Sequence, residues 1–198
     1  MTIKVGITGG IGSGKSTVCG VFKTIGIPIF EADQVAKKLM NENREIRKTL
    51  TGWFGEELYT SGVLNRKMLS GLIFNNTELL EKVNALIHPL VRETFLQWSE
   101  EQTTPYSVYE AAILFESGFY RLMDFTILVS APEHLRIERV IERDKITAEE
   151  VVARMKNQWS DDEKRKLAST EIINDNKNLI VPLIIEIDKK LRTDGKIW

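Results

Sequence analysis

Residues Gly9 to Thr17 read Gly-Gly-Ile-Gly-Ser-Gly-Lys-Ser-Thr, and Gly9 through Ser16 fit the phosphate-binding pattern Gly-x-x-x-x-Gly-Lys-Ser/Thr. Glycine has no steric penalty at positive φ, so such a loop can turn its backbone N–H groups inward around phosphate oxygens. Lys15 can reach the β- and γ-phosphates, and the Ser16 hydroxyl can ligate Mg²⁺. The stretch therefore predicts a nucleoside triphosphate as ligand. The predicted binding residues are Gly10, Ile11, Gly12, Ser13, Gly14, Lys15, Ser16 and Thr17.

The residues on both sides of this loop support the same interpretation. Residues 3–8 form a short, largely apolar run that predicts a strand. Residues 17–25 carry apolar side chains at helical spacing, and Gly26 is a plausible C-terminal stop. Strand, glycine loop and helix is the order that the motif needs, because a helix N-terminus also favours an anion. A glycine-rich turn that contains Lys-Ser by chance is the weaker alternative.

Candidate strands and helices alternate along the chain, which predicts a P-loop NTPase-like α/β fold with a five-stranded parallel sheet flanked by helices. The candidate strands are residues 3–8, 27–31, 106–114, 125–130 and 171–173. A last helix is expected over residues 179–191.

Two helical excursions interrupt this core. About 70 residues between the second and third strands have no strand pattern, and such a length should carry structure of its own. We expect a helical insertion that carries substrate specificity. A helix beginning at Pro132 and two capping boxes, at Thr147–Glu150 and Ser160–Glu163, predict a second excursion. The predicted helices of the insertion are 33–41, 44–54, 66–74, 77–87 and 89–101. The predicted division is a nucleotide-binding core of 1–32, 105–135 and 168–198, an insertion of 33–104 and a helical lid of 136–167, all in one compact unit.

The composition excludes several function classes. The net charge of −1 gives no basic field for nucleic acid or an anionic membrane. No apolar run approaches the roughly 20 residues of a membrane span, and no secretory leader is visible. The single cysteine, Cys19, fits a reducing cytoplasm and is expected to be a small buried side chain. With two histidines it offers no zinc cluster. A cytoplasmic protein is expected.

Asp33 stands just past the second candidate strand. Ligands of open parallel sheets bind at the carboxyl ends of the strands, so its carboxylate could face the phosphate loop and accept the proton of an attacking hydroxyl. Equally, Asp33 could simply cap a helix that begins at Gln34. Glu31 could share its face or be a solvated strand end.

Arg136, Arg139 and Arg143 are spaced three and four residues apart, which places them on one stripe of a helix. Such a stripe could cover the triphosphate and neutralise charge during transfer. Because Glu138 and Glu142 are interleaved, the pattern alone favours a salt-bridged solvent face.

Two further positions are balanced between function and structure. Glu116 follows the apolar stretch of the third strand, where it could hold Mg²⁺ through water, bind a substrate group or be a polar strand terminus. His88-Pro89 is expected to separate two helices, and His88 could contact substrate or pack at the junction.

The ordered set of motifs resembles the dephospho-CoA kinase family from residue 3 to about Asn176. Residues 8–17 match its phosphate loop, and Glu31-Ala32-Asp33 stands where the family has Asp-Ala-Asp. Further matching elements are Gly62 to Arg66, Ile87-His88-Pro89, Ile113 to Glu116, and Arg139 to Asp144 with Gln158 and Lys164. Departures include Glu31, Ala112 for a proline, Ala168-Ser169 for Ala-Asp, and Asn174-Asp175-Asn176 for Asn-Asp-Gly, where an asparagine must supply the αL residue.

The resemblance implies transfer of the γ-phosphate of ATP, with Mg²⁺, to the ribose 3′-hydroxyl of dephospho-CoA, giving CoA and ADP in the last step of coenzyme A biosynthesis. It implies catalytic roles for Lys15, Asp33 as base and Arg139. The partners implied are ATP and dephospho-CoA, without nucleic acid or membrane, and we favour a monomer. The implied nucleotide-binding residues outside the loop are Arg139, Arg143 and Asn174. The implied substrate-binding residues are Asp33, Arg66, His88 and Glu116.

Three alternatives compete with this assignment. Another small-molecule or nucleotide kinase would share the loop and the lid, and the insertion with Arg66 and His88 argues against it. A GTP-driven switch usually carries Asp-x-x-Gly and Asn-Lys-x-Asp motifs; no aspartate here precedes a glycine by three places, and Asn176-Lys177-Asn178-Leu179 lacks the final aspartate. The intact phosphate loop disfavours an inert structural domain.

Overall fold

The computed structural model describes residues 2–73 and 76–193 of the 198-residue chain. The chain divides into two compact units, Met1–Glu31 with Ser99–Trp198 and Ala32–Trp98. The predicted lid residues 136–167 belong to the first unit. Phe74, the last residue of one predicted helix, and residues 1 and 194–198 of the predicted core lie outside the described residues.

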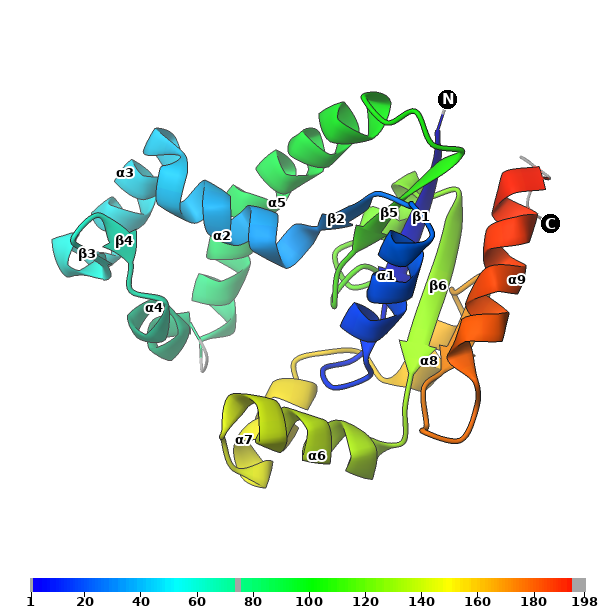
Figure 1. Ribbon diagram of the computed structural model, residues 1–198. Coiled ribbons are helices and arrows are strands. Elements are labelled where there is room, and N and C mark those ends of the chain that lie inside the picture. The colour runs from blue at the N-terminus through cyan, green and yellow to red at the C-terminus, as the bar shows by residue number, and fades with distance from the viewer. Residues whose placement is uncertain (1, 74–75, 194–198) are drawn as a thin grey trace. The chain divides into compact units, whose positions relative to one another are not determined.

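A parallel sheet forms the centre of the first unit (Figure 1), and among the described residues it has five strands in the order β2-β5-β1-β6-β7. The predicted fold class is therefore confirmed. β1 pairs with both β5 and β6, so the central strand lies where the strand order reverses. Ligands of such sheets bind at the carboxyl ends of the strands at this reversal. The strands are β1 (Ile3–Thr8), β2 (Ile29–Glu31), β5 (Tyr106–Glu110), β6 (Phe125–Ser130) and β7 (Thr170–Ile173).

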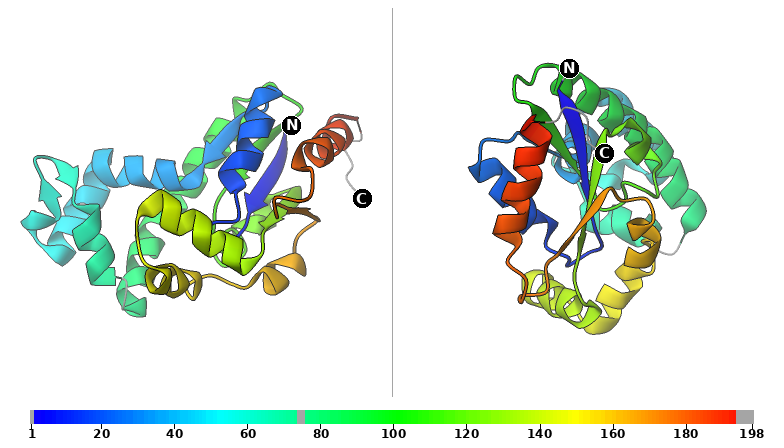
Figure 2. Two further views of the ribbon diagram at one scale, coloured as in Figure 1. Left: turned by 60° about the horizontal axis from the view of Figure 1, so that its bottom comes forward. Right: turned by 90° about the vertical axis from the view of Figure 1, so that its right-hand side faces the viewer.

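The helices α1 (Lys15–Thr24) and α9 (Ile180–Thr193) cover one face of this sheet, and further views show α9 alongside the strands (Figure 2). Their apolar faces join the strand side chains in a single buried cluster, which is the hydrophobic core. The cluster includes Val5, Ile7, Val18, Cys19, Phe22, Val108, Ile127, Val129, Ile172, Ile184, Ile187 and Leu191. Cys19 is buried as expected, and burial raises the pKa of its thiol to about 12.

The predicted stop at Gly26 is confirmed. Gly26 has φ +87°, which glycine adopts without steric cost. The N–H of Gly26 bonds to the carbonyl of Lys23, and the N–H of Ile27 bonds to the carbonyl of Phe22. These bonds satisfy carbonyls that the end of a helix would otherwise leave unpaired.

The third strand is shorter than predicted, because β5 ends at Glu110 and not at Leu114. Residues 112–118 form turns that continue into the 3-10 helix η2 (Phe119–Leu122). Leu114 and Phe115 are buried, so the apolar run reflects burial and not strand pairing. The chain satisfies its backbone locally, with Ser117 N–H bonded to the Ile113 carbonyl and Gly118 N–H to that of Phe115. Glu116 therefore lies in a turn and not at a strand end.

His88-Pro89 does not break a helix, contrary to the prediction: α5 (Thr77–Glu100) is continuous, with Pro89 in its interior. A proline there removes one hydrogen bond and costs about 3 kcal/mol. The buried residues Val83, Ile87, Val91 and Phe95 follow one another at four-residue spacing across the proline. Burial of this continuous apolar stripe offsets that cost.

The second unit also holds a small hairpin where no strand was predicted. β3 (Tyr59–Thr60) pairs antiparallel with β4 (Val63–Leu64). Its two turn residues, Ser61 and Gly62, have φ of +51° and +80°. Two successive residues with positive φ characterise the type I′ turn, whose twist matches a hairpin. The strands are too short for a period-two pattern to be visible in the sequence. The other elements of this unit are α2 (Ala32–Glu42), α3 (Arg44–Phe54), η1 (Glu56–Leu58) and α4 (Arg66–Ile73).

The second predicted excursion comprises α6 (Glu133–Asp144), α7 (Ala148–Met155) and α8 (Asp161–Arg165). Both capping boxes are confirmed, at Thr147 with Glu150 and at Ser160 with Glu163. Asn176 has φ +64°, so the αL residue expected of this asparagine is present. Among the residues described, no helix combines the length and the apolar character needed to cross a membrane.

The C-terminal helix is joined to the sheet by a buried polar contact that gives a first prediction. Tyr106 donates to Asp188 Oδ1 at 2.7 Å, and Arg192 Nε donates to the same carboxylate at 2.8 Å. Because the Tyr106 side chain is fully buried, Tyr106→Phe should leave Asp188 short of one donor. We expect a loss of about 1–2 kcal/mol of unfolding free energy in urea denaturation. Tyr120→Phe is the matched control, and equal effects of the two replacements would contradict the role of the Tyr106–Asp188 bond.

Candidate active site

The phosphate loop connects β1 to α1 at the carboxyl end of the central strand (Figure 1). Gly12 and Gly14 have φ of +79° and +91°, and Gly14 is the N-cap of α1. These two glycines therefore stand where the backbone needs a left-handed conformation. The loop ends on a helix N-terminus, whose partial positive charge favours phosphate.

The carbonyl groups of Gly9 through Gly14 all accept hydrogen bonds, so their positions in the loop are fixed. Lys15 Nζ donates to the Gly9 carbonyl at 2.8 Å, and Ser13 N–H donates to that of Gly10 at 3.1 Å. The Gly14 carbonyl accepts from Thr17 N–H at 3.0 Å. The remaining three carbonyls, those of residues 11, 12 and 13, bond to side chains from other elements. The N–H groups of Gly12, Gly14 and Ser16 take no part in these bonds.

Three of the long-range donors come from α6 and from the segment after β7. Arg136 Nε donates to the Ile11 carbonyl at 3.0 Å, and Arg139 Nη1 to the Gly12 carbonyl at 3.4 Å. Asn174 Nδ2 donates to the Ser13 carbonyl at 3.0 Å. Two residues of the predicted arginine stripe therefore lie against the phosphate loop. The interpretation of the stripe as a solvent face paired with Glu138 and Glu142 is wrong for these two residues.

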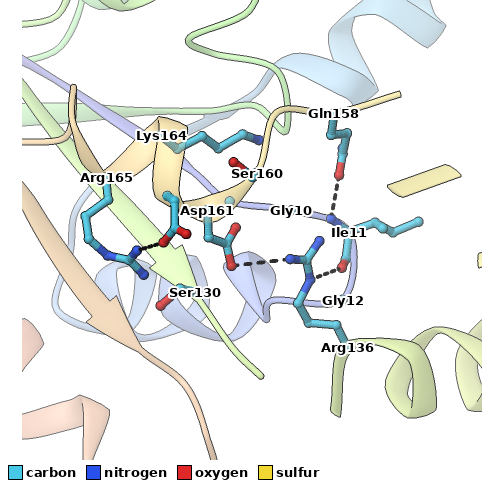
Figure 3. A network of polar contacts seen from close by, with 12 residues as sticks. Gly10, Ile11, Gly12, Ser130, Arg136, Gln158, Ser160, Asp161, Lys164 and Arg165 are labelled. Atoms are coloured by element: carbon cyan, nitrogen blue, oxygen red, sulfur yellow. Dashed lines mark hydrogen bonds and ion pairs between the residues drawn. The ribbon is translucent and has the colours of Figure 1, made fainter. Parts of the chain in front are cut away.

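Arg136 is almost completely buried, with a residue exposure of 8%. Its charge is paired with Asp161 at 3.3 Å (Figure 3). A Cβ atom at Gly10 would lie 2.0 Å from Arg136 Nη2, and one at Gly12 would lie 2.4 Å from the Arg136 carbonyl oxygen. Glycine at these positions therefore also lets α6 approach the loop closely.

Arg139 and Arg143 have different surroundings. Arg139 Nη2 also donates to the Asn174 carbonyl at 3.0 Å and to Asn176 Oδ1 at 2.7 Å, which ties α6 to the segment after β7. Arg143 is exposed and donates to its neighbour Asp144 at 2.7 Å, which raises the pKa of Arg143 and lowers that of Asp144. The described contacts therefore bring Arg139, but not Arg143, to the phosphate loop.

A second polar group contacts the loop from the segment before α8. Gln158 Oε1 accepts a 2.8 Å hydrogen bond from the N–H of Ile11 (Figure 3). The next residue, Trp159, donates its N–H to Glu116 Oε1 at 3.0 Å. Glu116 is held in turn by Lys164, whose fully buried ammonium lies 3.0 Å from the same oxygen. Glu116 Oε2 is buried, and among the described residues it has no hydrogen-bond partner.

A cavity of about 590 Å³ lies beside these residues. Arg136, Gln158 and Asp161 form part of its wall, together with Lys156 and Trp159. Its lining mixes both signs of charge with apolar groups, which gives it no evident preference for one class of ligand.

Glu31 is the last residue of the first segment of the first unit, and Asp33 belongs to the second unit, which begins at Ala32. Glu31 ends β2 and binds Lys23 at 2.5 Å, which raises the pKa of the Lys23 ammonium. Asp33 is exposed in the first turn of α2, and this helix begins at Ala32, so Asp33 is not the cap of a helix beginning at Gln34. Arg66 is exposed at the first position of α4, and none of the described contacts gives its side chain a structural role.

Asp33 and His88, both in the second unit, interact electrostatically. Burial lowers the pKa of the His88 imidazole, because it disfavours the charged form, and the Asp33 carboxylate acts in the opposite direction. Since the folded pKa lies below the unfolded value, protonation favours the unfolded chain. The stability that His88 contributes is therefore present above the unfolded pKa and is lost as the pH falls through the folded pKa.

This interaction predicts that Asp33→Asn lowers the pKa of His88 further, because the replacement removes a nearby negative charge. The chain has two histidines, so an NMR titration of their ring protons resolves His88 from His134, which serves as the internal control. A midpoint for His88 that is unchanged in the variant would contradict the interaction.

The residues fit a magnesium–nucleotide complex. Mg²⁺ usually takes one or two protein oxygens, with substrate phosphates and water as its other ligands. The described residues contain no group of three or more His, Cys, Asp or Glu that could hold a metal by themselves. The Ser16 hydroxyl at the start of α1 supplies the kind of single oxygen that such a complex needs.

The residue pattern alone did not identify Gln158, Asp161 or Lys164, which support the phosphate loop and its neighbours from the segment around α8. Asp161 had no predicted role, and Gln158 and Lys164 were cited only through the family resemblance. Lys164 lies in a five-residue helix that reads as polar on all sides, yet its side chain is fully buried. The sequence signal for Asp161 is weak. It is one of three acidic residues in the first turn of α8, and nothing in the local pattern distinguishes it from the other two.

The parallel sheet and the glycine loop at its switch point together define a P-loop nucleotide-binding fold. The family model of dephospho-CoA kinases matches residues 3–179. The chain therefore belongs to the dephospho-CoA kinase family and is a phosphate-transferring enzyme.

Relatives and solved structures agree with this membership. A dephospho-CoA kinase of Bacteroides fragilis (strain YCH46) is 41% identical over 188 residues, which cover 94% of this chain and 92% of the relative. One of Porphyromonas gingivalis is 42% identical over 192 residues, covering 96% and 95%. The structure of dephospho-CoA kinase from Campylobacter jejuni is 27% identical, with a TM-score of 0.70 and coverage of 97% and 98%. Shikimate kinase from Acinetobacter baumannii, 15% identical with a TM-score of 0.53 and coverage of 100% and 97%, shares the fold.

Proposed function

We propose that this chain transfers the γ-phosphate of ATP to the ribose 3′-hydroxyl of dephospho-CoA, giving CoA and ADP, the last step of coenzyme A biosynthesis. The observation that carries the proposal is the complete hydrogen bonding of the loop carbonyls, from Gly9 to Gly14, in a member of the dephospho-CoA kinase family. A loop whose carbonyls are already bonded can offer its remaining N–H groups to phosphate without reorganisation.

The residue roles follow from the chemistry of phosphoryl transfer. The proton of the 3′-hydroxyl moves to the Asp33 carboxylate while the hydroxyl oxygen bonds to the γ-phosphorus, and the bond from that phosphorus to the bridging oxygen of ADP breaks. Lys15 and Arg139 stabilise the charge on the transferring group and the leaving oxygen. Bound through Ser16, Mg²⁺ would supply further neutralisation of the phosphates. The proposed nucleotide-binding residues are residues 10–17, Arg139, Arg143 and Asn174. The proposed substrate-binding residues are Asp33, Arg66, His88 and Glu116.

Other parts of the assignment belong to the same proposal. Residues 33–104 are the insertion that binds the CoA substrate, and residues 136–167 are the lid. Lid closure over the triphosphate would exclude water that could hydrolyse ATP. The enzyme acts in the cytoplasm as a monomer, without nucleic acid or membrane as partner.

The test is a coupled assay of ADP release by the purified protein with ATP and Mg²⁺. The acceptors are dephospho-CoA, adenosine and a panel of nucleoside monophosphates. We expect saturable turnover with dephospho-CoA alone, and mass spectrometry of the product should show CoA. Saturable turnover with a nucleoside monophosphate, and none with dephospho-CoA, would replace this proposal with that of a nucleotide kinase.

A further inference from the structure

We infer that Gln158 is a positioning residue, whose side-chain oxygen holds the Ile11 peptide and thereby presets the phosphate loop for ATP. The inference rests on the proposed function only for its turnover measurements, since nucleotide binding can be measured without an acceptor. Gln158 is separated from the loop by almost 150 residues of chain, so its place there is a property of the fold.

The geometry shows that Ile11 is held on both sides. Its N–H donates to Gln158 Oε1 at 2.8 Å, and its carbonyl accepts from Arg136 Nε at 3.0 Å (Figure 3). These two groups belong to the two peptide units that flank the Ile11 Cα atom. Because a peptide unit is rigid and planar, bonds to both units restrain φ and ψ of Ile11 together.

The bond from Gln158 also fixes the carbonyl of Gly10. In a trans peptide the N–H and the C=O point in opposite directions, so an Ile11 N–H that points toward Gln158 directs the Gly10 carbonyl the other way. That carbonyl accepts the Ser13 N–H at 3.1 Å and lies 3.5 Å from Lys15 Nζ. Gln158 therefore stabilises the turn of residues 10–13 and the surroundings of the loop lysine.

The segment that carries Gln158 is itself anchored to the core. The N–H of Gln158 bonds to the Met155 carbonyl, and the N–H of Trp159 bonds to Glu116. Lys164, which is fully buried, pairs with Glu116 and donates to the Ala112 carbonyl at 2.9 Å. A glutamine on this anchored segment offers its acceptor at a fixed place, which is what presetting the loop requires.

The first experiment compares Gln158→Met with the wild type, since methionine keeps the length of the side chain and lacks the acceptor. A preset loop contributes equally to the ground state and the transition state. We therefore expect about a five- to tenfold rise in KM for ATP with kcat nearly unchanged. The dissociation constant of the imido analogue of ATP, measured by calorimetry with Mg²⁺ and no acceptor, should rise by the same factor. Gln102→Met, the same replacement just ahead of β5, is the matched control.

A double-mutant cycle decides whether Gln158 acts through the Ile11 N–H. Ile11→Pro removes this donor, because proline has no N–H. In the Ile11→Pro background, Gln158→Met should change the dissociation constant of the analogue less than twofold, since residues in direct contact are not additive. The same factor in both backgrounds would overturn the inference.

Amide exchange gives a readout that does not depend on the proline variant. In the protein without nucleotide, the Ile11 amide should be protected in the wild type and exchange at least about tenfold faster in Gln158→Met. If Gln158 had only a structural role, Gln158→Met would lower the melting temperature and the active fraction of the protein and leave the KM for ATP unchanged. That result would also overturn the inference. Absence of turnover in the wild type would instead contradict the proposed function. The binding and exchange measurements would then still decide the role of Gln158, because neither needs an acceptor.

Discussion

Asp33→Asn is expected to lower kcat by about 10²- to 10³-fold with dephospho-CoA as acceptor, because the amide cannot accept the proton of the attacking hydroxyl. The dissociation constant of the ATP analogue should change by less than about threefold, since Asp33 belongs to the acceptor side of the proposed reaction. The replacement keeps the size of the side chain, and Asp33 is exposed in the first turn of α2, so the fold should tolerate it. The measurements are steady-state ADP release and calorimetry on the same preparation.

The control for loss of charge is Asp124→Asn. Asp124 accepts from the Lys4 N–H at 2.7 Å just ahead of β6, and an asparagine oxygen can accept the same bond. Its kcat should stay within about twofold of the wild type. If Asp33→Asn also retains near-wild-type kcat, Asp33 does not act as the base and contributes only to the first turn of its helix.

The strands that the sequence predicted best are those buried on both faces. β1 and β6 have the predicted bounds, because a continuous apolar run between turn residues is typical of a central parallel strand. The same logic extended β5 too far, because Leu114 and Phe115 are buried although they lie in turns and not in a strand. Pro89 led to the opposite error, since it predicted two short helices where the structure has one long helix, α5. The apolar stripe of α5 continues across Pro89 and outweighs the local cost of the proline.

The site was predictable to the extent that its chemistry is local in the chain. The phosphate loop carries its own pattern, so Lys15 and Ser16 could be assigned from spacing. Gln158, Asp161 and Lys164 could not be placed in this way, because each contacts a residue far away in the chain, and periodicity describes only near neighbours. Arg136 is an intermediate case: its helix face was predicted, but its buried contact with the loop was not.

Lys164→Met is expected to lower the free energy of unfolding by about 3 kcal/mol, because it breaks a buried ion pair and leaves the Glu116 charge uncompensated. Lys164 is fully buried, and the Glu116 side chain is 13% exposed. Urea denaturation measures the effect. Lys166→Met, a replacement of an exposed lysine two residues later, should change stability by less than about 0.5 kcal/mol.

The double variant Lys164→Met with Glu116→Gln separates the ion pair from the volume of the side chains. Removing both charges should restore part of the lost stability, because a neutral glutamine has no buried charge to compensate and can still accept the Trp159 N–H. A double variant as unstable as the sum of the single variants would mean that the charges are not coupled.

The same variants test how stability and catalysis are connected in this enzyme. If the Lys164–Glu116 pair anchors the segment that carries Gln158, Lys164→Met should raise the KM for ATP even under conditions where the protein is fully folded. Glu116→Gln alone keeps the bond to Trp159, so it should raise this KM less. It should instead affect the KM for dephospho-CoA if Glu116 binds that substrate. Measuring both KM values for each variant therefore distinguishes an anchor of the phosphate loop from a substrate ligand.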